Sequence, residues 1–278
     1  MTLDPVARTA RLTAAARARE SARDDRLFDD PLAAVLAGDT GRALLAPLGD
    51  ASVIAVRTRF FDDAVTRLFR TGTDTGTDLR QLVLLAAGMD TRAYRLDLPA
   101  DTVLFELDRP ELLDLKARLL AGVPAPAPVP RCIRRTVGVD LADDWPAALA
   151  AAGFHPHRPT CWLAEGLTPY LEESAVHRLL DRITALSAPG SHLLTDFVGR
   201  SLLESPRARP MLEALARSGA AWHFGTEEPE LLLGDRNWRA EVTRVAVAGR
   251  AMGRRPDSVD AERTAPDAPQ GYFVHGSR

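Results

Sequence analysis

The sequence predicts an α/β protein with a doubly wound, mostly parallel, Rossmann-like sheet and a helical N-terminal cap. Three observations support this fold class. The length of 278 residues suits one large domain. A content of 46% hydrophobic and 26% charged residues is that of a globular protein and excludes a disordered or coiled-coil chain. From about residue 80 onward, short continuous apolar runs alternate with helical patterns, which is typical of parallel strands buried on both faces.

Helical patterns occupy the first quarter of the chain. Residues 5–22 are rich in alanine, and after the break at Pro31 a second helix is expected over residues 31–37. Residues 52–70 form a third pattern, with apolar residues recurring on one helical face. The stretch Thr71–Asp78, rich in Thr, Gly and Asp, predicts a surface loop.

Seven strands are expected in the rest of the chain. Four of them are predicted to be buried and parallel, the fifth follows a helical pattern over Glu172–Leu186, and two later runs are expected to close the sheet, in part antiparallel. In chain order they are Leu82–Ala86, Val103–Leu107, Thr136–Val139, Cys161–Ala164, His192–Phe197, Ala240–Val247 and Tyr272–His275. A helix is expected over Glu111–Leu120, and the Pro-rich piece Val123–Pro130 is interpreted as a loop.

We expect a single domain over residues 1–278 with three parts. Residues 1–79 are predicted to form a helical cap or lid, residues 80–200 the cofactor-binding core, and residues 201–278 a substrate-side insertion with the closing strands.

Composition excludes several classes of protein. A net charge of −3, from 35 basic and 38 acidic residues, argues against a nucleic-acid partner. Cys132 and Cys161 have no ligand-spaced partners, so neither a metal site nor a disulfide framework is expected. No apolar run approaches the roughly 20 residues of a membrane span, and no secretory signal pattern opens the chain. We therefore predict a cytoplasmic protein with a small-molecule partner; the sequence does not indicate an oligomeric state.

The residues that follow the first four predicted strands form one chemical set. They are Gly88, Glu106, Asp140-Leu141 and Glu165-Gly166. Ligands of open α/β sheets bind at the carboxyl ends of the strands, so these residues are expected to share a site. One glycine and three acids suit an adenosine with a cationic tail better than a pyrophosphate, which favours basic residues. The set predicts a sulfonium nucleoside, S-adenosylmethionine, as the ligand.

Gly88 allows close approach of the backbone to the ligand. Glu106, about 20 residues further on, is placed to accept hydrogen bonds from ribose hydroxyls. Asp90 or Thr91 is expected to cap the helix that follows Gly88, and Asp108 to cap the helix after the second strand. The full G-x-G-x-x-G pattern is absent, which disfavours a dinucleotide.

Four segments together resemble the leucine carboxyl methyltransferase family, and in particular its bacterial polyketide O-methyltransferases, similar to the tetracenomycin-pathway carboxyl methylase. They are Arg57-Thr58-Arg59-Phe60-Phe61-Asp62, Leu85–Leu96 with its Gly88-Met89-Asp90-Thr91-Arg92, Val139-Asp140-Leu141 and Trp162–Leu167 with its Ala164-Glu165-Gly166-Leu167. The likeness extends from about Ala16 to Phe197, and a weaker similarity covers Trp222–Val242.

The resemblance implies a class I S-adenosylmethionine-dependent O-methyltransferase, which releases S-adenosylhomocysteine and uses no metal. It implies that Arg57 grips the methionine carboxylate with help from Arg19, and that Gly88 lies under the methionine portion. It places Glu106 on the ribose, Asp140-Leu141 around the adenine and Glu165 near the methionine ammonium. From the residues alone, Arg57 is equally a helix-face arginine paired with Asp62 or Asp63.

Two positions depart from the family pattern. Ala86-Ala87-Gly88 stands where many relatives have Gly-Ala-Gly, and an added methyl at Ala86 narrows the turn. Ala142 follows Asp140-Leu141 where relatives commonly have Arg. Because that Arg could anchor a carboxylate substrate, its absence means that the group to be methylated can be a hydroxyl as well as a carboxylate. Ala142, Tyr170 and His223 are the candidate substrate contacts, and Tyr170 and His223 are also candidates for catalysis. For both, plain packing is the alternative.

The predicted function is methyl transfer to a carboxylate or hydroxyl of a small molecule in polyketide or other secondary metabolism. Three alternatives remain open at this point: a protein C-terminal carboxyl methyltransferase, an NAD(P)-dependent oxidoreductase on a similar fold, and a non-catalytic relative of the fold that binds nothing or serves as a partner subunit.

Overall fold

The computed structural model describes residues 5–48, 51–75, 79–124, 126, 128–254 and 270–278. Their centre is a seven-stranded sheet in the order β3-β2-β1-β4-β5-β7-β6. Strands β1 to β5 run parallel, whereas β7 is antiparallel to both of its neighbours. The strands are β1 Gln81–Leu85, β2 Val103–Asp108, β3 Ile133–Gly138, β4 Thr160–Ala164, β5 His192–Val198, β6 Arg239–Arg244 and β7 Gly271–Ser277. This is the doubly wound, mostly parallel sheet that the sequence predicts.

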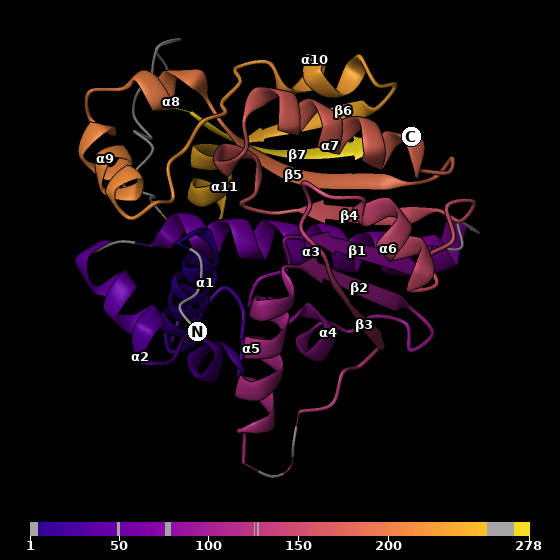
Figure 1. Cartoon of the computed structure of the whole chain (residues 1–278), viewed down its shortest axis with the longest axis horizontal. Coiled ribbons are helices and arrows are strands. Elements are labelled where there is room, and N and C mark those ends of the chain that lie inside the picture. The colour runs from indigo at the N-terminus through magenta and orange to yellow at the C-terminus, as the bar shows by residue number, and fades with distance from the viewer. Residues whose placement is uncertain (1–4, 49–50, 76–78, 125, 127, 255–269) are drawn as a thin grey trace.

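Helices lie on both faces of the sheet and around its carboxyl edge (Figure 1). The α-helices are α1 Pro5–Ser21, α2 Ala33–Leu45, α3 Ser52–Thr75, α4 Arg92–Arg95, α5 Pro110–Ala121, α6 Trp145–Ala151, α7 Glu173–Ala185, α8 Arg200–Glu204, α9 Arg209–Arg217, α10 Pro229–Gly234 and α11 Val245–Ala251. Two short 3-10 turns, η1 Ala46–Leu48 and η2 Thr168–Tyr170, complete the described elements.

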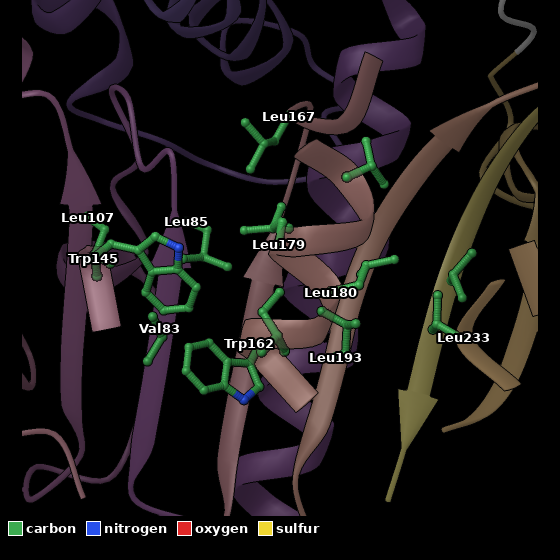
Figure 2. Packing of buried hydrophobic residues seen from close by; sticks show 14 of the residues in the cluster. Val83, Leu85, Leu107, Trp145, Trp162, Leu167, Leu179, Leu180, Leu193 and Leu233 are labelled. Carbon is green, nitrogen blue, oxygen red and sulfur yellow. The ribbon is translucent and has the colours of Figure 1, made fainter. Parts of the chain in front are cut away.

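The central strand β1 is buried along its whole length because apolar side chains leave it on both faces. Val83 and Leu85 belong to the core under α6, α7 and α10. In Figure 2, they lie on the same face as Trp162 and the α7 residues Leu179 and Leu180. The alternate residues Leu82 and Leu84 belong to the second core, on the opposite face.

Helix α3 is part of this second core. Phe61, Val65 and Phe69 are fully buried and belong to the same cluster as sheet residues of β1, β2, β4, β5 and β7. The expectation that the whole of residues 1–79 forms a cap is therefore wrong for α3, which covers the sheet itself.

The N-terminal cap consists of α1 and α2, packed closely on each other. A Cβ atom at Gly41 would lie 2.3 Å from the carbonyl oxygen of Arg11, so glycine is what lets the two backbones approach. Ala14, Leu36 and Met89 are members of the small apolar core that joins this cap to α5 and to the turn after β1.

Several sequence-based boundaries are corrected. The third strand is an edge strand and is mostly exposed rather than buried, with Ile133 45% exposed. The run 240–247 is strand only to Arg244, after which Val245–Ala251 is helix α11. Helix α2 continues beyond residue 37 to Leu45, across a kink at Gly38. The predicted loop Thr71–Asp78 is wrong over 71–75, which extend α3, while 76–78 lie outside the described residues.

Candidate functional site

A cavity of about 1420 Å³ opens at the carboxyl edge of the sheet. The turns after β1, β3 and β4 line it together with the ends of β2 and β5, and residues of α1, α3, α7 and α9 complete its walls. In Figure 1, α1, α2, α8 and α9 all gather at this end of the sheet. Pockets for one small ligand are usually about 300–1,000 Å³, so this strand-end cavity has room for two ligands side by side.

The turn after β1 approaches the cap closely at Gly88. Gly88 has φ of +51°, and a Cβ there would lie 3.1 Å from the Cβ of Ala10 on α1. Its backbone N–H donates a hydrogen bond to Oδ2 of Asp108 at 2.7 Å. Ala86 in the same turn also has a positive φ, of 55°, which is strained for a residue with a Cβ. Both residues line the cavity, as the sequence predicts for Gly88.

The acid at the end of β2 is Asp108, not Glu106. Glu106 is fully buried and does not line the cavity. It accepts hydrogen bonds from Lys116 at 2.8 Å and from both Nε and Nη2 of Arg134 at 2.9 and 2.7 Å. The predicted ribose contact of Glu106 is therefore wrong, because β2 runs two residues further and carries Asp108 to the cavity.

Asp108 also does not cap the following helix, as the sequence suggested. The N-cap residue of α5 is Arg109, and no side chain caps the helix there. Asp108 instead accepts from the N–H groups of Gly88 and Arg109, at 2.7 and 2.8 Å. Burial raises the pKa of its carboxyl group, and these hydrogen bonds oppose the shift. Its remaining acceptor capacity is available to a ligand hydroxyl.

The turn after β3 supplies Asp140, Leu141 and Ala142, which all line the cavity. Asp140 Oδ1 accepts from the backbone N–H of Ala142 at 2.9 Å, and Oδ2 lies 3.2 Å from Nε of Arg109. These contacts hold the turn in place without using every lone pair of the carboxylate oxygens. Asp140 can therefore accept a further hydrogen bond from a ligand.

Arg57 joins the ends of β4 and β5. Its Nε donates to Glu165 at 3.0 Å and its Nη1 to Asp196 at 3.2 Å. The alternative pairing of Arg57 with Asp62 or Asp63 does not occur. Gly166, with φ of +65°, makes room for this guanidinium: a Cβ there would lie 2.9 Å from Nη1 of Arg57.

A buried ion-pair network continues from Arg57 across the floor of the cavity. Arg92 binds Glu165 at 2.8 Å, and also Asp90 and Asp62. Arg95 and Arg17 extend the network to Asp30. The carboxylates so connected are Asp30, Asp62, Asp90, Glu165 and Asp196, and the guanidinium groups are those of Arg17, Arg57, Arg92 and Arg95. With all groups ionised, this described network has one carboxylate more than it has cations.

The pKa shifts follow from this network. Burial opposes the ionisation of Glu165, but the charges of Arg92 and Arg57 outweigh it and lower its pKa. The same competition lowers the pKa of Asp90 to about 2, with Arg92 the main charge. At Asp196, burial prevails and raises the pKa although Arg57 opposes it. A bound cation would therefore favour the ionised form of Asp196.

Asp90 lines the cavity, but its side chain binds Arg92: its carboxylate accepts a hydrogen bond from the backbone N–H of Arg92 at 2.6 Å. Arg19 lies outside the cavity. It is exposed and lines a small separate depression between α1 and α2. Two positions earlier, on another face of α1, Arg17 lines the strand-end cavity and donates to Asp30 at 2.8 Å. The predicted cofactor contact of Arg19 is therefore wrong, and Arg17 is the α1 arginine at the site.

Tyr170 and Trp222 form one side of the cavity, with their rings 6.3 Å apart and nearly perpendicular. His223 points elsewhere: it does not line the cavity, and its Nδ1 lies 3.2 Å from Glu172. Its predicted substrate contact is therefore wrong. Its backbone N–H donates to the carbonyl of Pro169 at 2.7 Å, which places the neighbouring Trp222 beside Tyr170.

Sequence reasoning missed Arg92 and Asp196 as site residues. Asp196 is the one acidic residue of strand β5 and lies near its carboxyl end, and that position was a usable signal. Arg92 lies within Leu85–Leu96, one of the segments that carry the family resemblance. Among the described residues, no group of three or more His, Cys, Asp or Glu side chains is arranged to hold a metal. No described helix combines the length and apolar character needed to cross a membrane.

Comparison with known proteins gives a consistent result. Residues 10–184 match the model of the family described as leucine carboxyl methyltransferase. A protein of Parafrankia sp. (strain EAN1pec) is 42% identical over 98% of this chain and 87% of its own length. One of Mycolicibacterium gilvum (strain PYR-GCK) is 44% identical over 77% of this chain and 74% of its own. Both are named provisionally as S-adenosylmethionine-dependent methyltransferases.

Two solved structures show the same fold at low sequence identity. A DUF574 family protein from Streptomyces avermitilis aligns with a TM-score of 0.63 at 15% identity, over 97% of each chain. A protein from Thermobifida fusca, titled provisionally as a methyltransferase, aligns with a TM-score of 0.57 at 20% identity, over 92% of this chain and 94% of its own.

Proposed function

The chain belongs to the leucine carboxyl methyltransferase family and is an S-adenosylmethionine-dependent methyltransferase; on this premise we propose that it methylates an oxygen of a small organic acceptor. The observation that supports the cofactor site best is that Asp108 and the ion pairs of Arg57 with Glu165 and Asp196 line one cavity at the strand ends.

Each group of S-adenosylmethionine has a proposed partner in the cavity. Asp108 would accept from the ribose hydroxyls, and Asp140 with Leu141 would border the adenine. Arg57 would hold the methionine carboxylate, and Glu165 with Asp196 its ammonium. S-adenosylmethionine has one net positive charge, from its ammonium and sulfonium against one carboxylate. Its carboxylate and ammonium would meet the guanidinium of Arg57 and the carboxylates of Glu165 and Asp196.

Gly88 would lie under the methionine portion, where a side chain would meet Ala10 of the cap. Asp90 would act through Arg92, because its carboxylate already binds that guanidinium. In this arrangement α1 covers the cofactor, since Ala10 and Arg17 both line the cavity.

When bound, S-adenosylmethionine supplies an electrophilic methyl group on a sulfonium. The task of the protein is to align an acceptor oxygen with that methyl, and such alignment contributes roughly 7–11 kcal/mol to rate acceleration. Tyr170 and Trp222 would orient the acceptor, because they line the cavity near Arg57. Ala142 would border the acceptor on the side of the turn after β3.

The lining favours an acceptor that needs no help to ionise. No histidine is among the described residues that line the cavity. A carboxylate is ionised near pH 7, as is an acidic hydroxyl, whereas an ordinary phenol with a pKa near 10 requires a base. The α9 residues Met211, Ala214 and Leu215 add apolar surface, which suits the large apolar skeletons of polyketides and other secondary metabolites.

The test is product analysis with S-adenosylmethionine carrying a deuterated methyl group. Purified protein would be incubated with a panel of polycyclic and long-chain carboxylic acids and acidic phenols, and products followed by mass spectrometry. Mild base would then cleave an ester and spare an ether. Labelled product with the methyl on oxygen is expected; a methyl on nitrogen or carbon would overturn the assignment. An Asp108→Asn variant is the matched control for product formation.

A further inference from the structure

We propose that Arg178 and Arg182 of α7 form an anion subsite that holds a carboxylate, sulfonate or phosphate group of the acceptor, away from the oxygen that is methylated. The inference rests on the proposed function only in taking the second ligand of the cavity to be the methyl acceptor. It assigns that acceptor to the class of molecules with an apolar body and a remote negative charge.

One face of α7 lines the strand-end cavity. Residues 175, 178, 179 and 182 follow the i, i+3, i+4, i+7 spacing of a single helical stripe, and all four line the cavity. Ala175 and Leu179 form an apolar row, and Arg178 and Arg182 a cationic row beside it. The wall thus offers apolar contact and positive charge to the same ligand.

Neither arginine is neutralised within the described residues. Arg178 Nη1 donates to the hydroxyl of Ser174 at 3.2 Å, and Arg182 Nη1 to the backbone carbonyl of Asp143 at 2.7 Å. Both partners are neutral, and neither guanidinium forms an ion pair with a described carboxylate. Two like charges four residues apart on a helix repel each other. The pair therefore keeps unused charge and donors that face the cavity.

The acidic groups of the cavity are engaged elsewhere. Glu165 and Asp196 bind Arg57, and Asp90 binds Arg92. Asp108 accepts from two backbone N–H groups, and Asp140 pairs with Arg109. The strand ends of the cavity therefore carry carboxylates paired with arginines or backbone N–H groups, whereas Arg178 and Arg182 of α7 have no ion-pair partner among the described residues. An anionic group on a ligand is attracted to these two cations.

The position of the pair separates it from the reacting oxygen. Arg182 contacts Asp143, next to Ala142 and Leu141, so the pair borders the turn proposed to hold the adenine. The methionine end is proposed at Arg57 and Glu165, at the ends of β4 and β5. An anion on Arg178 and Arg182 is thus a tether at one end of the acceptor.

The test uses two fluorescent naphthalene dyes that differ in one anionic group: 8-anilino-1-naphthalenesulfonate and its neutral counterpart N-phenyl-1-naphthylamine. Each is titrated into the full-length protein in the presence of saturating S-adenosylhomocysteine. The variants are Arg178→Gln, Arg182→Gln and the double variant, with Arg118→Gln as control because Arg118 is exposed on α5 and outside the cavity.

We expect the double variant to bind the sulfonate dye about tenfold more weakly, the usual effect of losing charge-assisted hydrogen bonds. The neutral dye should bind all proteins alike, and Arg118→Gln should behave as wild type. Unchanged sulfonate affinity, or equal loss of both dyes, would overturn the subsite. Calorimetry with S-adenosylhomocysteine separates the two proposals. If the cofactor binds but the dye effect is absent, only the subsite is wrong; a dye effect without cofactor binding refutes the proposed cofactor site instead.

Discussion

The backbone N–H of Gly88 donates a hydrogen bond to the carboxylate of Asp108 at 2.7 Å, which ties the turn after β1 to the carboxyl end of β2. These are the two strand ends that flank a ribose in the proposed cofactor site. Asp108 can accept from a ligand only because β2 reaches it, two residues beyond the buried Glu106.

Asp108→Asn should weaken binding of S-adenosylmethionine by at least about tenfold, because an amide cannot accept from two ribose hydroxyls as a carboxylate does. Calorimetric titration gives the affinity, and thermal unfolding shows whether the fold is kept. Equal affinity in variant and wild type would remove Asp108 from the ribose site.

Glu106→Gln should act on stability rather than on the cofactor. The change leaves the fully buried Lys116 ammonium without its carboxylate, and breaking a buried ion pair from one side costs about 3–5 kcal/mol. Urea unfolding of wild type, Glu106→Gln and Asp108→Asn measures this. A fully stable Glu106→Gln protein that has lost cofactor binding would contradict the assignment.

Arg57→Gln should separate the two ends of the cofactor. Binding of S-adenosylhomocysteine should fall by about tenfold or more, because the methionine carboxylate loses its cation. Binding of 5′-methylthioadenosine, which lacks that carboxylate, should not change, whereas Asp108→Asn should weaken both ligands. If Arg57→Gln weakened both equally, Arg57 would be a structural residue of the floor.

Ala86→Gly should stabilise the protein by about 1 kcal/mol, since a residue with a Cβ is strained at φ of 55° and glycine is not. The change also widens the turn, so cofactor affinity should be kept or raised. Chemical denaturation and calorimetry on the same sample check both. A loss of stability would show that the methyl of Ala86 contributes packing that outweighs the strain.

His192 should make the protein less stable in mild acid. Burial, and then the nearby His275, lower its pKa to about 4 from the usual 6.5. Between these values the unfolded chain binds the proton and the folded protein does not. The contribution of His192 to the free energy of unfolding is therefore fully present above pH 6.5 and is lost as the pH falls toward 4.

The check is the difference between the stability curves of wild type and His192→Gln from pH 7 to pH 4, which cancels the carboxylates that both share. The curves should converge as the pH falls. Parallel curves would mean that His192 is protonated in the folded protein as readily as in the unfolded chain.

Much of the architecture follows from the sequence, because buried strands such as Gln81–Leu85 are continuous apolar runs that few other structures accept. The sequence predicted strand β3 but placed it in the interior of the sheet. Its position at the edge depends on which strands pair with it, and the residues of β3 alone do not show that. Val245 and the apolar residues after it fit either a strand or a helix, and packing against α3 and the sheet decides for helix α11.

The site was predicted in outline for a similar reason. Gly88, Asp140, Leu141 and Glu165 follow directly from the rule that ligands bind at strand ends. Glu106 was chosen over Asp108 because the strand was predicted to end at Leu107, one residue short of its observed end, and Asp108 was interpreted as a helix cap. Arg19 was carried over from the family resemblance, and the sequence does not show which face of α1 meets the cavity; two positions on a helix differ by more than a right angle.

The most direct test of the cofactor assignment is calorimetric titration of the wild-type protein with S-adenosylmethionine, S-adenosylhomocysteine and NADPH. The strand-end cavity predicts saturable binding of the first two ligands at one site per chain, in the affinity range of about micromolar, and no binding of NADPH. Absence of heat with both adenosyl ligands, or saturable binding of NADPH, would contradict the proposed cofactor site.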